Sequence, residues 1–494
     1  MAEDLPSPEV RRGRRPGDVY VRRPRLRTRA LPRVLGAASL YSAAYGNVGS
    51  SIYYALGVTA LFALGLTPLV FVASGIFFGF TALTYAEGAT AMPVAGGSTA
   101  FARRAFNELA SFVAGWGQLL NFMVTIAISA FAVPNYLGTF WEPLGEYPGN
   151  TIFGIAVIGG LAAVNVLGVR ESSVVNVGLA LLDLLTQVML VLLGIVFLLS
   201  LPTLMANVRF GEAPTWDRFF LGIAISMIAY TGIETVSNLA EETRNPGRNV
   251  PRSVLSVFGT VLVIYALLPG IALSSLPVRL VGDEYQTDLA EEFITDPVLG
   301  IVEGLPGPLQ PSLEVWVGIL AATILLIATN AGLLGLSRLA YSMGQHRQLP
   351  PQVSRLHPVR RTPVSAIIVF GLLSALFIIP GQVEILASLY AFGAMLSFTI
   401  AHAAIIALRA REPNLTRPFR IPLNVRLRGV DIPLTAVAGG MATAFAWLVV
   451  VVTQASGRYI GFSWLAVGLI MYLVYRRAIG APLTKTVRVE GPGR

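Results

Sequence analysis

Long apolar runs recur along the chain, separated by shorter polar stretches. Each run holds about 20 residues, which as a helix is enough to cross roughly 30 Å of hydrocarbon. The runs lie near residues 34–63, 68–90, 109–138, 151–168, 175–201, 219–240, 253–276, 313–343, 363–380, 384–408, 432–453 and 459–475. The pattern therefore predicts an all-α membrane protein with twelve transmembrane helices.

Small and polar residues interrupt two of these runs. The first run carries GNVGSS at Gly46–Ser51, and the sixth carries YTGIET at Tyr230–Thr235, about 184 residues later. Because the two runs are five apart, they cross the membrane in opposite directions. Matching interruptions in two such spans are typical of an inverted five-helix repeat, in which discontinuous helices 1 and 6 meet near the bilayer midplane.

An interruption at membrane depth predicts a binding site. Irregular backbone is tolerated there only where protein or a water-filled cavity satisfies it. The free N–H groups at the start of a half-helix carry positive partial charge, and the free carbonyls at the end of the other half carry negative charge, which suits a zwitterion. Close helix packing is the alternative for Gly46 and Gly49. The polar residues beside them, Asn47, Ser50 and Ser51, favour the site.

Composition agrees with a membrane protein and excludes several kinds of chemistry. Of the 494 residues, 54% are hydrophobic and 13% are charged, whereas an average soluble domain is about one quarter charged. The absence of cysteine excludes disulfides and thiolate metal sites, and the three histidines are too scattered for a His metal cluster. The chain contains no HExxH, GxSxG or GxxxxGK motif. We therefore expect no cofactor, no metal, no enzymatic activity and no direct ATP drive.

Charge predicts the orientation in the membrane. The net charge of +9 comes mostly from the run Arg11–Arg29. Beside a membrane span, such a run favours a topology signal and contact with anionic lipid heads over nucleic-acid binding. With the amino terminus inside, only four of the 36 basic residues lie outside, as expected because Lys and Arg in short loops stay cytoplasmic. We expect a multi-pass protein of the cytoplasmic membrane with both termini in the cytoplasm.

The repeat and the charge pattern together divide the chain into five parts. They are a basic cytoplasmic tail at 1–33, a first five-helix repeat at 34–201, a second at 219–409, peripheral helices 11 and 12 at 432–476, and a carboxyl-terminal tail at 477–494.

Several motifs carry a family resemblance. The first span has GNVGSS, and PVAGG after the second span is followed by FARRAFNE and GWGQ. AYTGIETVSNLAEETRNPGRNVPR at Ala229–Arg252 begins within the sixth span and continues past it, and NAGLLGLSRLAYSMGQHRQLPPQV at Asn330–Val353 covers part of the eighth span and the loop after it. In these motifs, and over nearly all of residues 34–480, the chain resembles the amino acid-polyamine-organocation permeases.

The resemblance implies a fold, an activity and a site. It implies the ten-helix core of the leucine-transporter type plus two peripheral helices, and a secondary transporter of amino acids or related amines that works by alternating access. In that family, first-span amides hold the substrate carboxylate and sixth-span carbonyls hold its amine. The matching residues here are Gly46, Asn47, Gly49, Ser50 and Ser51 in the first span, and Ala229, Tyr230, Thr231 and Gly232 in the sixth.

Glu234 is an acidic residue about 15 residues into the sixth span. Placing a charged acid at the bilayer centre costs about 2.5 to 3.5 kcal/mol on insertion scales. Keeping a glutamate protonated at pH 7 costs a similar amount, roughly 3.7 kcal/mol. A change in hydration between two conformations could therefore switch its protonation, so we predict that Glu234 couples transport to protons. A permanent partner, an arginine or backbone N–H groups, is the alternative.

Asp183 is the second candidate for coupling, and it marks a departure from the family. Many proton-coupled members carry a lysine in the fifth span, whereas the only lysine here is Lys485, in the tail. By position the family lysine falls on Asp183, so coupling through a lysine is not available. Asp183 could hold a proton, help to bind sodium, or make a structural hydrogen bond.

The sequence is also compatible with a second coupling ion, an alternative function and a gate of aromatic residues. Sodium is a less favoured coupling ion than H⁺, and Thr329 or Ser337 could supply oxygen ligands for it. The stretch YGNVGSSIYYALG also resembles the first span of potassium-uptake permeases, which makes cation uptake the alternative function. Aromatic residues could gate the pocket, although in membrane spans they more often pack or anchor the helix; the candidates are Tyr230, Phe122 and Trp116.

Overall fold

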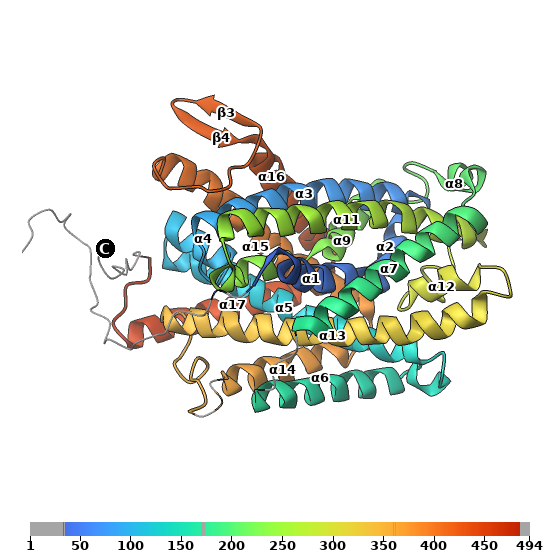
Figure 1. Ribbon diagram of the computed structural model, residues 1–494, viewed down its shortest axis with the longest axis horizontal. Helices are drawn as coiled ribbons and strands as arrows, with labels where there is room; N and C mark the ends of the chain where they lie inside the picture. The colour runs from blue at the N-terminus through green and yellow to red at the C-terminus, as the bar shows by residue number, and fades with distance from the viewer. Residues whose placement is uncertain (1–32, 34, 169–172, 359, 361, 485–494) are drawn as a thin grey trace, which may run out of the picture.

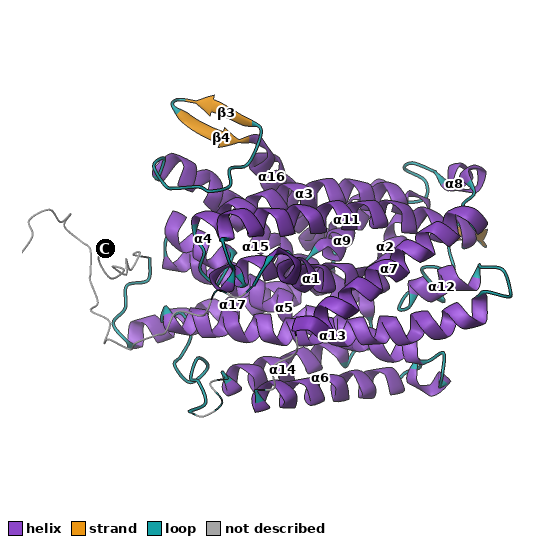
Figure 2. Ribbon diagram, in the orientation of Figure 1, coloured by secondary structure: helices purple, strands orange, loops and turns teal. Residues whose placement is uncertain are grey.

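The structure is a computed structural model that describes residues 33, 35–168, 173–358, 360 and 362–484. The predicted basic tail, apart from Arg33, and the last residues of the carboxyl-terminal tail, including Lys485, lie outside the described residues. Within these residues, ten helical stretches are long and apolar enough to cross a membrane. The described part of the chain is therefore that of an all-helical membrane protein, apart from two short hairpins of strands (Figure 2).

The helices follow the predicted apolar runs closely. Their bounds are α1 Ala37–Val48, α2 Ile52–Ala63, α3 Thr67–Ala91, α4 Ser98–Ala105, α5 Glu108–Leu137, α6 Gly149–Leu167, α7 Ser173–Phe197, α8 Leu201–Asn207, α9 Trp216–Ser226, α10 Glu234–Asn238, α11 Pro246–Ser275, α12 Pro297–Glu303, α13 Gln310–Gln345, α14 Val364–Ile378, α15 Val383–Arg411, α16 Leu434–Thr453 and α17 Ala455–Ala478. Short 3-10 turns lie at Gly49–Ser51, Leu64–Leu66, Glu142–Leu144, Met227–Tyr230 and Ala240–Glu242.

The number of spans stays a prediction. One of the ten apolar stretches, Ala37–Ala91, contains both the first and the second predicted span. Within it, Leu64 has a φ of 45°, between the end of α2 and the start of α3. The ninth predicted span corresponds to α14, a shorter apolar helix of 15 residues.

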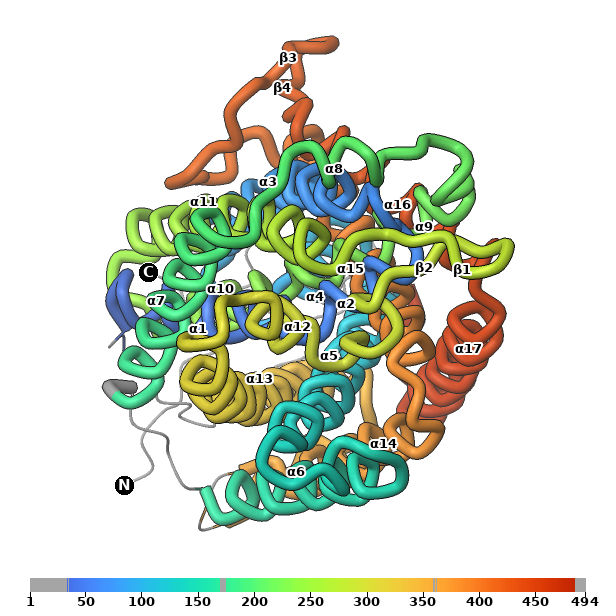
Figure 3. Tube along the Cα trace, turned by 90° about the vertical axis from the view of Figure 1, so that its right-hand side faces the viewer, coloured from blue at the N-terminus to red at the C-terminus, as the bar shows by residue number. Residues whose placement is uncertain are grey.

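Helix α5 occupies the centre of the bundle, and its most apolar window is entirely buried. It packs against α4, α6, α13, α14 and α15, and of these α6 and α14 lie together at the outer edge of the bundle (Figures 1 and 3). Asn107 caps its amino terminus, because the side-chain oxygen accepts a hydrogen bond from the Ala110 N–H at 2.9 Å. The polar residues that α5 carries are therefore held inside the bundle.

The two ends of the bundle differ in charge. One end carries α4, the loop after α13 and the hairpin of β3 (Asn424–Leu427) and β4 (Val430–Pro433), and it is rich in arginine. The other end carries α8, α12 and the hairpin of β1 (Arg279–Val281) and β2 (Glu284–Gln286) (Figure 1). The hairpin and α12 belong to the acidic stretch between α11 and α13.

Candidate functional site

The first interruption, between α1 and α2, is a tightened turn and not an unwound segment. Val48, Gly49 and Ser51 all keep right-handed helical dihedral angles. The hydroxyls of Ser50 and Ser51 donate to the carbonyl of Asn47 at 2.9 and 3.3 Å. Such hydroxyls compete with the backbone for its acceptors, which explains a 3-10 turn here. The sequence predicted a fuller break than this one.

Side chains from neighbouring helices bind the carbonyls at this turn. The Tyr265 hydroxyl of α11 donates to the carbonyls of Val48 and Gly49, at 2.6 and 3.2 Å. The Gln187 amide of α7 also donates to the Gly49 carbonyl, at 3.1 Å. These bonds satisfy backbone that lipid could not satisfy.

The second interruption, between α9 and α10, is a true break. Thr231 is extended, with φ −71° and ψ 155°, and Gly232 has a φ of 121°. The Ile228 carbonyl accepts the Thr231 N–H, and the Gly232 carbonyl accepts the Thr235 N–H. In the hydrogen bonds that the described residues form around this break, no donor reaches the three intervening carbonyls, those of Ala229, Tyr230 and Thr231.

The two interruptions touch each other. The Asn47 side-chain amide donates to the Thr235 hydroxyl at 3.1 Å, across 188 residues of sequence. A Cβ atom on Gly232 would lie 3.0 Å from the Asn47 amide carbon and 3.0 Å from a methyl group of Val48. Glycine is therefore needed at position 232 for two reasons: the backbone has a positive φ there, and the two spans approach each other closely.

Glu234 begins α10 directly behind the break and is 3% exposed. Its carboxylate accepts hydrogen bonds from Asn121 at 2.9 Å, from Gln118 at 3.2 Å and from the Gly232 N–H at 3.0 Å. Among the ion pairs formed by the described residues, none includes Glu234. This carboxylate is held by neutral donors, so a change in its protonation leaves no stranded counter-charge.

Asp183 lies beside the first interruption and is fully buried. Its carboxylate accepts the Tyr53 hydroxyl at 2.7 Å and the Gln187 amide at 2.9 Å. Because the same amide nitrogen also donates to the Gly49 carbonyl, Asp183 is linked to the turn through Gln187. The two acidic candidates thus lie at different interruptions, Asp183 at the first and Glu234 at the second.

Sequence reasoning missed the neutral residues that complete the site. Gln118 and Asn121 stand three apart on α5 and share Glu234. Tyr390 of α15 accepts hydrogen bonds from the hydroxyls of Thr125, at 2.9 Å, and of Thr231. Polar side chains on one face of a membrane helix mark functional positions, and the spacing of Gln118 and Asn121 was such a signal.

The aromatic and hydroxyl candidates divide between packing and the site. Trp116 stacks on Trp464 of α17 with ring centroids 4.3 Å apart, which is a packing role. Tyr230 stacks on Phe78 and donates to the Phe71 carbonyl at 2.7 Å. Phe122 is buried against α13. Thr329 and Ser337, the two residues considered as sodium ligands, lie on α13, and their hydroxyls donate to backbone carbonyls of the same helix.

Comparison with known proteins identifies the family. The model of the amino acid permease family matches residues 35–475. The chain belongs to this family. Among its relatives is the branched-chain amino acid permease BcaP of Bacillus subtilis (strain 168), 26% identical over 479 residues, covering 91% of this chain and 94% of the relative.

Other relatives carry different cargo names. The methylthioribose transporter of Bacillus subtilis (strain 168) is 24% identical over 91% of this chain and 95% of its own length. The human b(0,+)-type amino acid transporter 1 is 24% identical over 83% of each chain. The family and its members are transporters and not enzymes, and they do not favour the potassium-uptake alternative.

Proposed function

We propose that this amino acid permease is a secondary active transporter that moves amino acids or related amines by alternating access, coupled to protons. The observation that carries the proposal is the break at Thr231 and Gly232. It lies directly against the first interruption, and the carbonyls beside it accept no hydrogen bond from the residues that the structure describes. Free carbonyls at a half-helix end attract a cation such as a substrate amine.

In this proposal the substrate lies between the two interruptions. Its amine binds the carbonyls of Ala229, Tyr230 and Thr231. Its carboxylate binds the backbone amides of Gly49, Ser50 and Ser51 after the turn between α1 and α2 has opened, because in this structure the Gly49 N–H donates to the Tyr45 carbonyl. Gly46, Asn47 and Gly232 shape the space between them. Every one of these site residues is buried in the structure, which corresponds to a closed state. Opening toward each side in turn would admit and release the substrate.

The proposed architecture is a twelve-span protein with two inverted five-helix repeats and two peripheral helices. The contact between oppositely directed interruptions, 188 residues apart at Asn47 and Thr235, supports the inverted repeat. The arginine-rich end of the bundle supports an orientation in which that end faces the cytoplasm, with both termini on that side of the cytoplasmic membrane.

Glu234 is the proposed coupling residue, with Asp183 as a second proton or ion site. Glu234 touches the break directly through the Gly232 N–H, at 3.0 Å. Opening the site toward water would hydrate its carboxylate and favour the charged form, and closure would favour the neutral form. Protonation and substrate occupancy are thereby linked at one place.

The test is proton-driven uptake in reconstituted vesicles. A thermal-shift screen against twenty amino acids and polyamines first identifies a substrate, because a bound ligand raises the melting temperature. Uptake of the labelled substrate is then measured with and without an inward proton gradient, and with sodium replaced by choline. We expect Glu234→Gln to remove the response to the gradient.

The matched control is Glu108→Gln. Glu108 is also a buried carboxylate on the bundle, 1% exposed, but it accepts a hydrogen bond from Gln348, and no hydrogen bond among the described residues joins its side chain to either interruption. This variant should keep its response to the gradient. Equal responses of wild type and Glu234→Gln would refute the coupling role, and loss of uptake on replacing sodium would make sodium the coupling ion.

A further inference from the structure

A hairpin of two strands stands away from the helical bundle at its arginine-rich end. Strands β3 and β4 follow α15 and precede α16, and they project beyond the helices in both views (Figures 1 and 3). Arg428 and Gly429 form the turn between them, with φ values of 49° and 84°. Two central residues with positive φ are the mark of a tight hairpin turn that matches the twist of its strands.

The hairpin has one apolar face and one polar face. Val425 pairs with Ile432 and Leu427 pairs with Val430, so these four side chains lie on one face. Leu427 is 57% exposed and Val425 is 47% exposed. Arg426 pairs with Asp431 on the other face. Val430 and Ile432 are half-buried, so the exposed part of the apolar face is formed by Val425 and Leu427.

The hairpin begins and ends at the edge of the membrane-spanning region. Strand β4 ends at Pro433, and α16, an apolar stretch able to cross a membrane, starts at Leu434. The Leu434 N–H donates to the Leu423 carbonyl at 2.9 Å, which closes the base of the hairpin at that point. Strands of four residues reach about 13 Å, so the whole hairpin stays within reach of the membrane surface.

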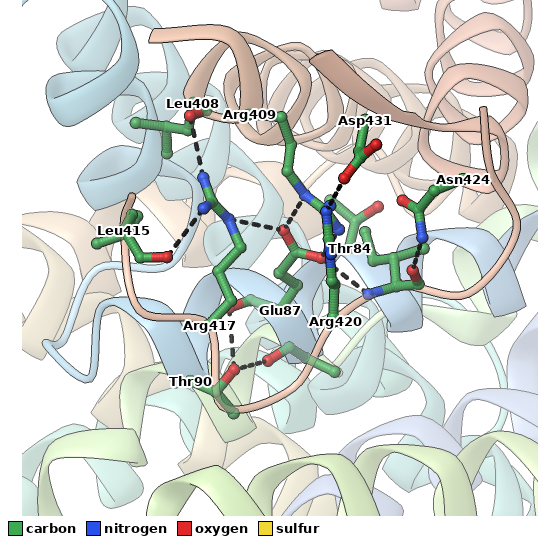
Figure 4. A network of polar contacts seen from close by, with 12 residues as sticks. Thr84, Glu87, Thr90, Leu408, Arg409, Leu415, Arg417, Arg420, Asn424 and Asp431 are labelled. Carbon is green, nitrogen blue, oxygen red and sulfur yellow. Dashed lines mark hydrogen bonds and ion pairs between the residues drawn. The ribbon is translucent and has the colours of Figure 1, made fainter. Parts of the chain in front are cut away.

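A buried ion cluster fixes the segment that leads into the hairpin (Figure 4). The Arg409 guanidinium of α15 binds the Glu87 carboxylate of α3 with two hydrogen bonds, of 2.7 and 2.6 Å. Arg417 lies 3.3 Å from the same carboxylate, which also accepts the Ile421 N–H at 2.8 Å. Arg420 then pairs with Asp431 of β4 (Figure 4). The hairpin is thus held in one orientation relative to the bundle.

The charge of the hairpin complements an anionic surface. Arg426 and Arg428 are exposed, and neither belongs to an ion pair among the described residues. Basic side chains next to a membrane attract anionic lipid heads, and an amphipathic element with basic and apolar faces lies in the interface plane.

We propose that the β3–β4 hairpin is a membrane-interface anchor. The hairpin contacts the lipid surface: the side chains of Val425 and Leu427 lie among lipid head groups, and Arg426 and Arg428 attract anionic phosphates. The choice of the cytoplasmic leaflet rests on the orientation proposed above, whereas contact with lipid does not depend on it or on the transport function.

The absence of cysteine from the chain gives a direct test. Leu427→Cys and the matched control Asn424→Cys, on the opposite face of the same strand, each carry a single environment-sensitive fluorophore on the full-length protein in lipid nanodiscs. We expect the label at position 427 to emit at shorter wavelength and to be quenched severalfold more by nitroxide-bearing lipids than the label at 424. Equal, water-like emission and equal quenching at both positions would overturn the proposal.

A second measurement tests the lipid chemistry. The melting temperature of the protein is compared between nanodiscs of neutral phosphatidylcholine and nanodiscs that also contain phosphatidylglycerol. The anionic lipid should raise it for the wild type and raise it less for the double variant Arg426→Gln, Arg428→Gln. An equal rise in both proteins would refute the role of these arginines. The label at 427 is also compared between nanodiscs that hold one copy of the protein and nanodiscs that hold several. If the label is shielded from water only when several copies are present, this face binds a second copy of the chain, and the lipid assignment is overturned.

Discussion

Replacing Glu87 by glutamine should lower the free energy of unfolding more than the loss of any surface ion pair would. Its carboxylate is 1% exposed and neutralises two buried guanidinium groups, Arg409 at 3% and Arg417 at 8% exposure. Glutamine keeps the shape of the side chain, but it removes the negative charge and turns N–H donors toward groups that can only donate. Breaking a buried pair by removing one partner costs about 3 to 5 kcal/mol, because it leaves an uncompensated charge.

Glu412 provides a matched control for Glu87. It binds Arg104 through a similar two-pronged contact, with a shortest distance of 2.7 Å, but the two side chains are 34% and 42% exposed. Exposed pairs contribute about 0.2 to 1 kcal/mol, so Glu412→Gln should have a small effect.

The assay for this pair of variants is reversible unfolding in mixed micelles, with the two glutamine variants measured side by side. We expect the loss of unfolding free energy for Glu87→Gln to exceed that for Glu412→Gln severalfold. If the two variants lost the same stability, the cluster around Glu87 would not be the buried charge network described here.

Two further variants test separate parts of the structure. Gly232→Ala should lower the melting temperature and impair uptake, because alanine is strained at a φ of 121° and its Cβ would crowd Asn47. The control Gly259→Ala lies in α11, outside the proposed site, and should be tolerated because no other atom lies within 4 Å of the added Cβ. Equal effects would contradict the need for glycine at the break. Burial, and to a smaller extent the charge of Glu292, raises the pKa of Asp296 from 3.8 to about 7. The folded state therefore binds the Asp296 proton more tightly than the unfolded state does, and the stability that this proton contributes is lost as the pH rises toward about 7. The melting temperature should therefore fall over that range more steeply in the wild type than in Asp296→Asn, and parallel curves would contradict this assignment.

Much of the fold could be predicted from hydrophobic pattern alone. Apolar runs of membrane length locate the long helices, and the glycine of YTGIET gave the position of the break at Gly232. The first interruption was harder, because glycine and serine allow either an unwound segment or a 3-10 turn. The bonds from Ser50 and Ser51 to the Asn47 carbonyl decide for the turn, and they depend on local geometry that the residue types leave open.

Contacts between distant residues could not be predicted from the sequence. Arg409 and Glu87 are 322 residues apart, and nothing in either local stretch predicts their pairing. Likewise, Glu234 was recognised as an unusual acid in a span, but its two side-chain donors, Gln118 and Asn121, come from another helix, α5, and nothing in the sequence around Glu234 predicts that α5 supplies them. The amphipathic hairpin after α15 was missed because its strands are only four residues long.

In the proposed function, the two interruptions together form a carrier site for an amino acid or amine. Uptake into proteoliposomes under an inward proton gradient tests it most directly, with a mixture of labelled amino acids in one set and rubidium, as a potassium substitute, in the other. We expect an amino acid to accumulate above its equilibrium level and rubidium not to do so. Accumulation of rubidium without any amino acid would contradict it.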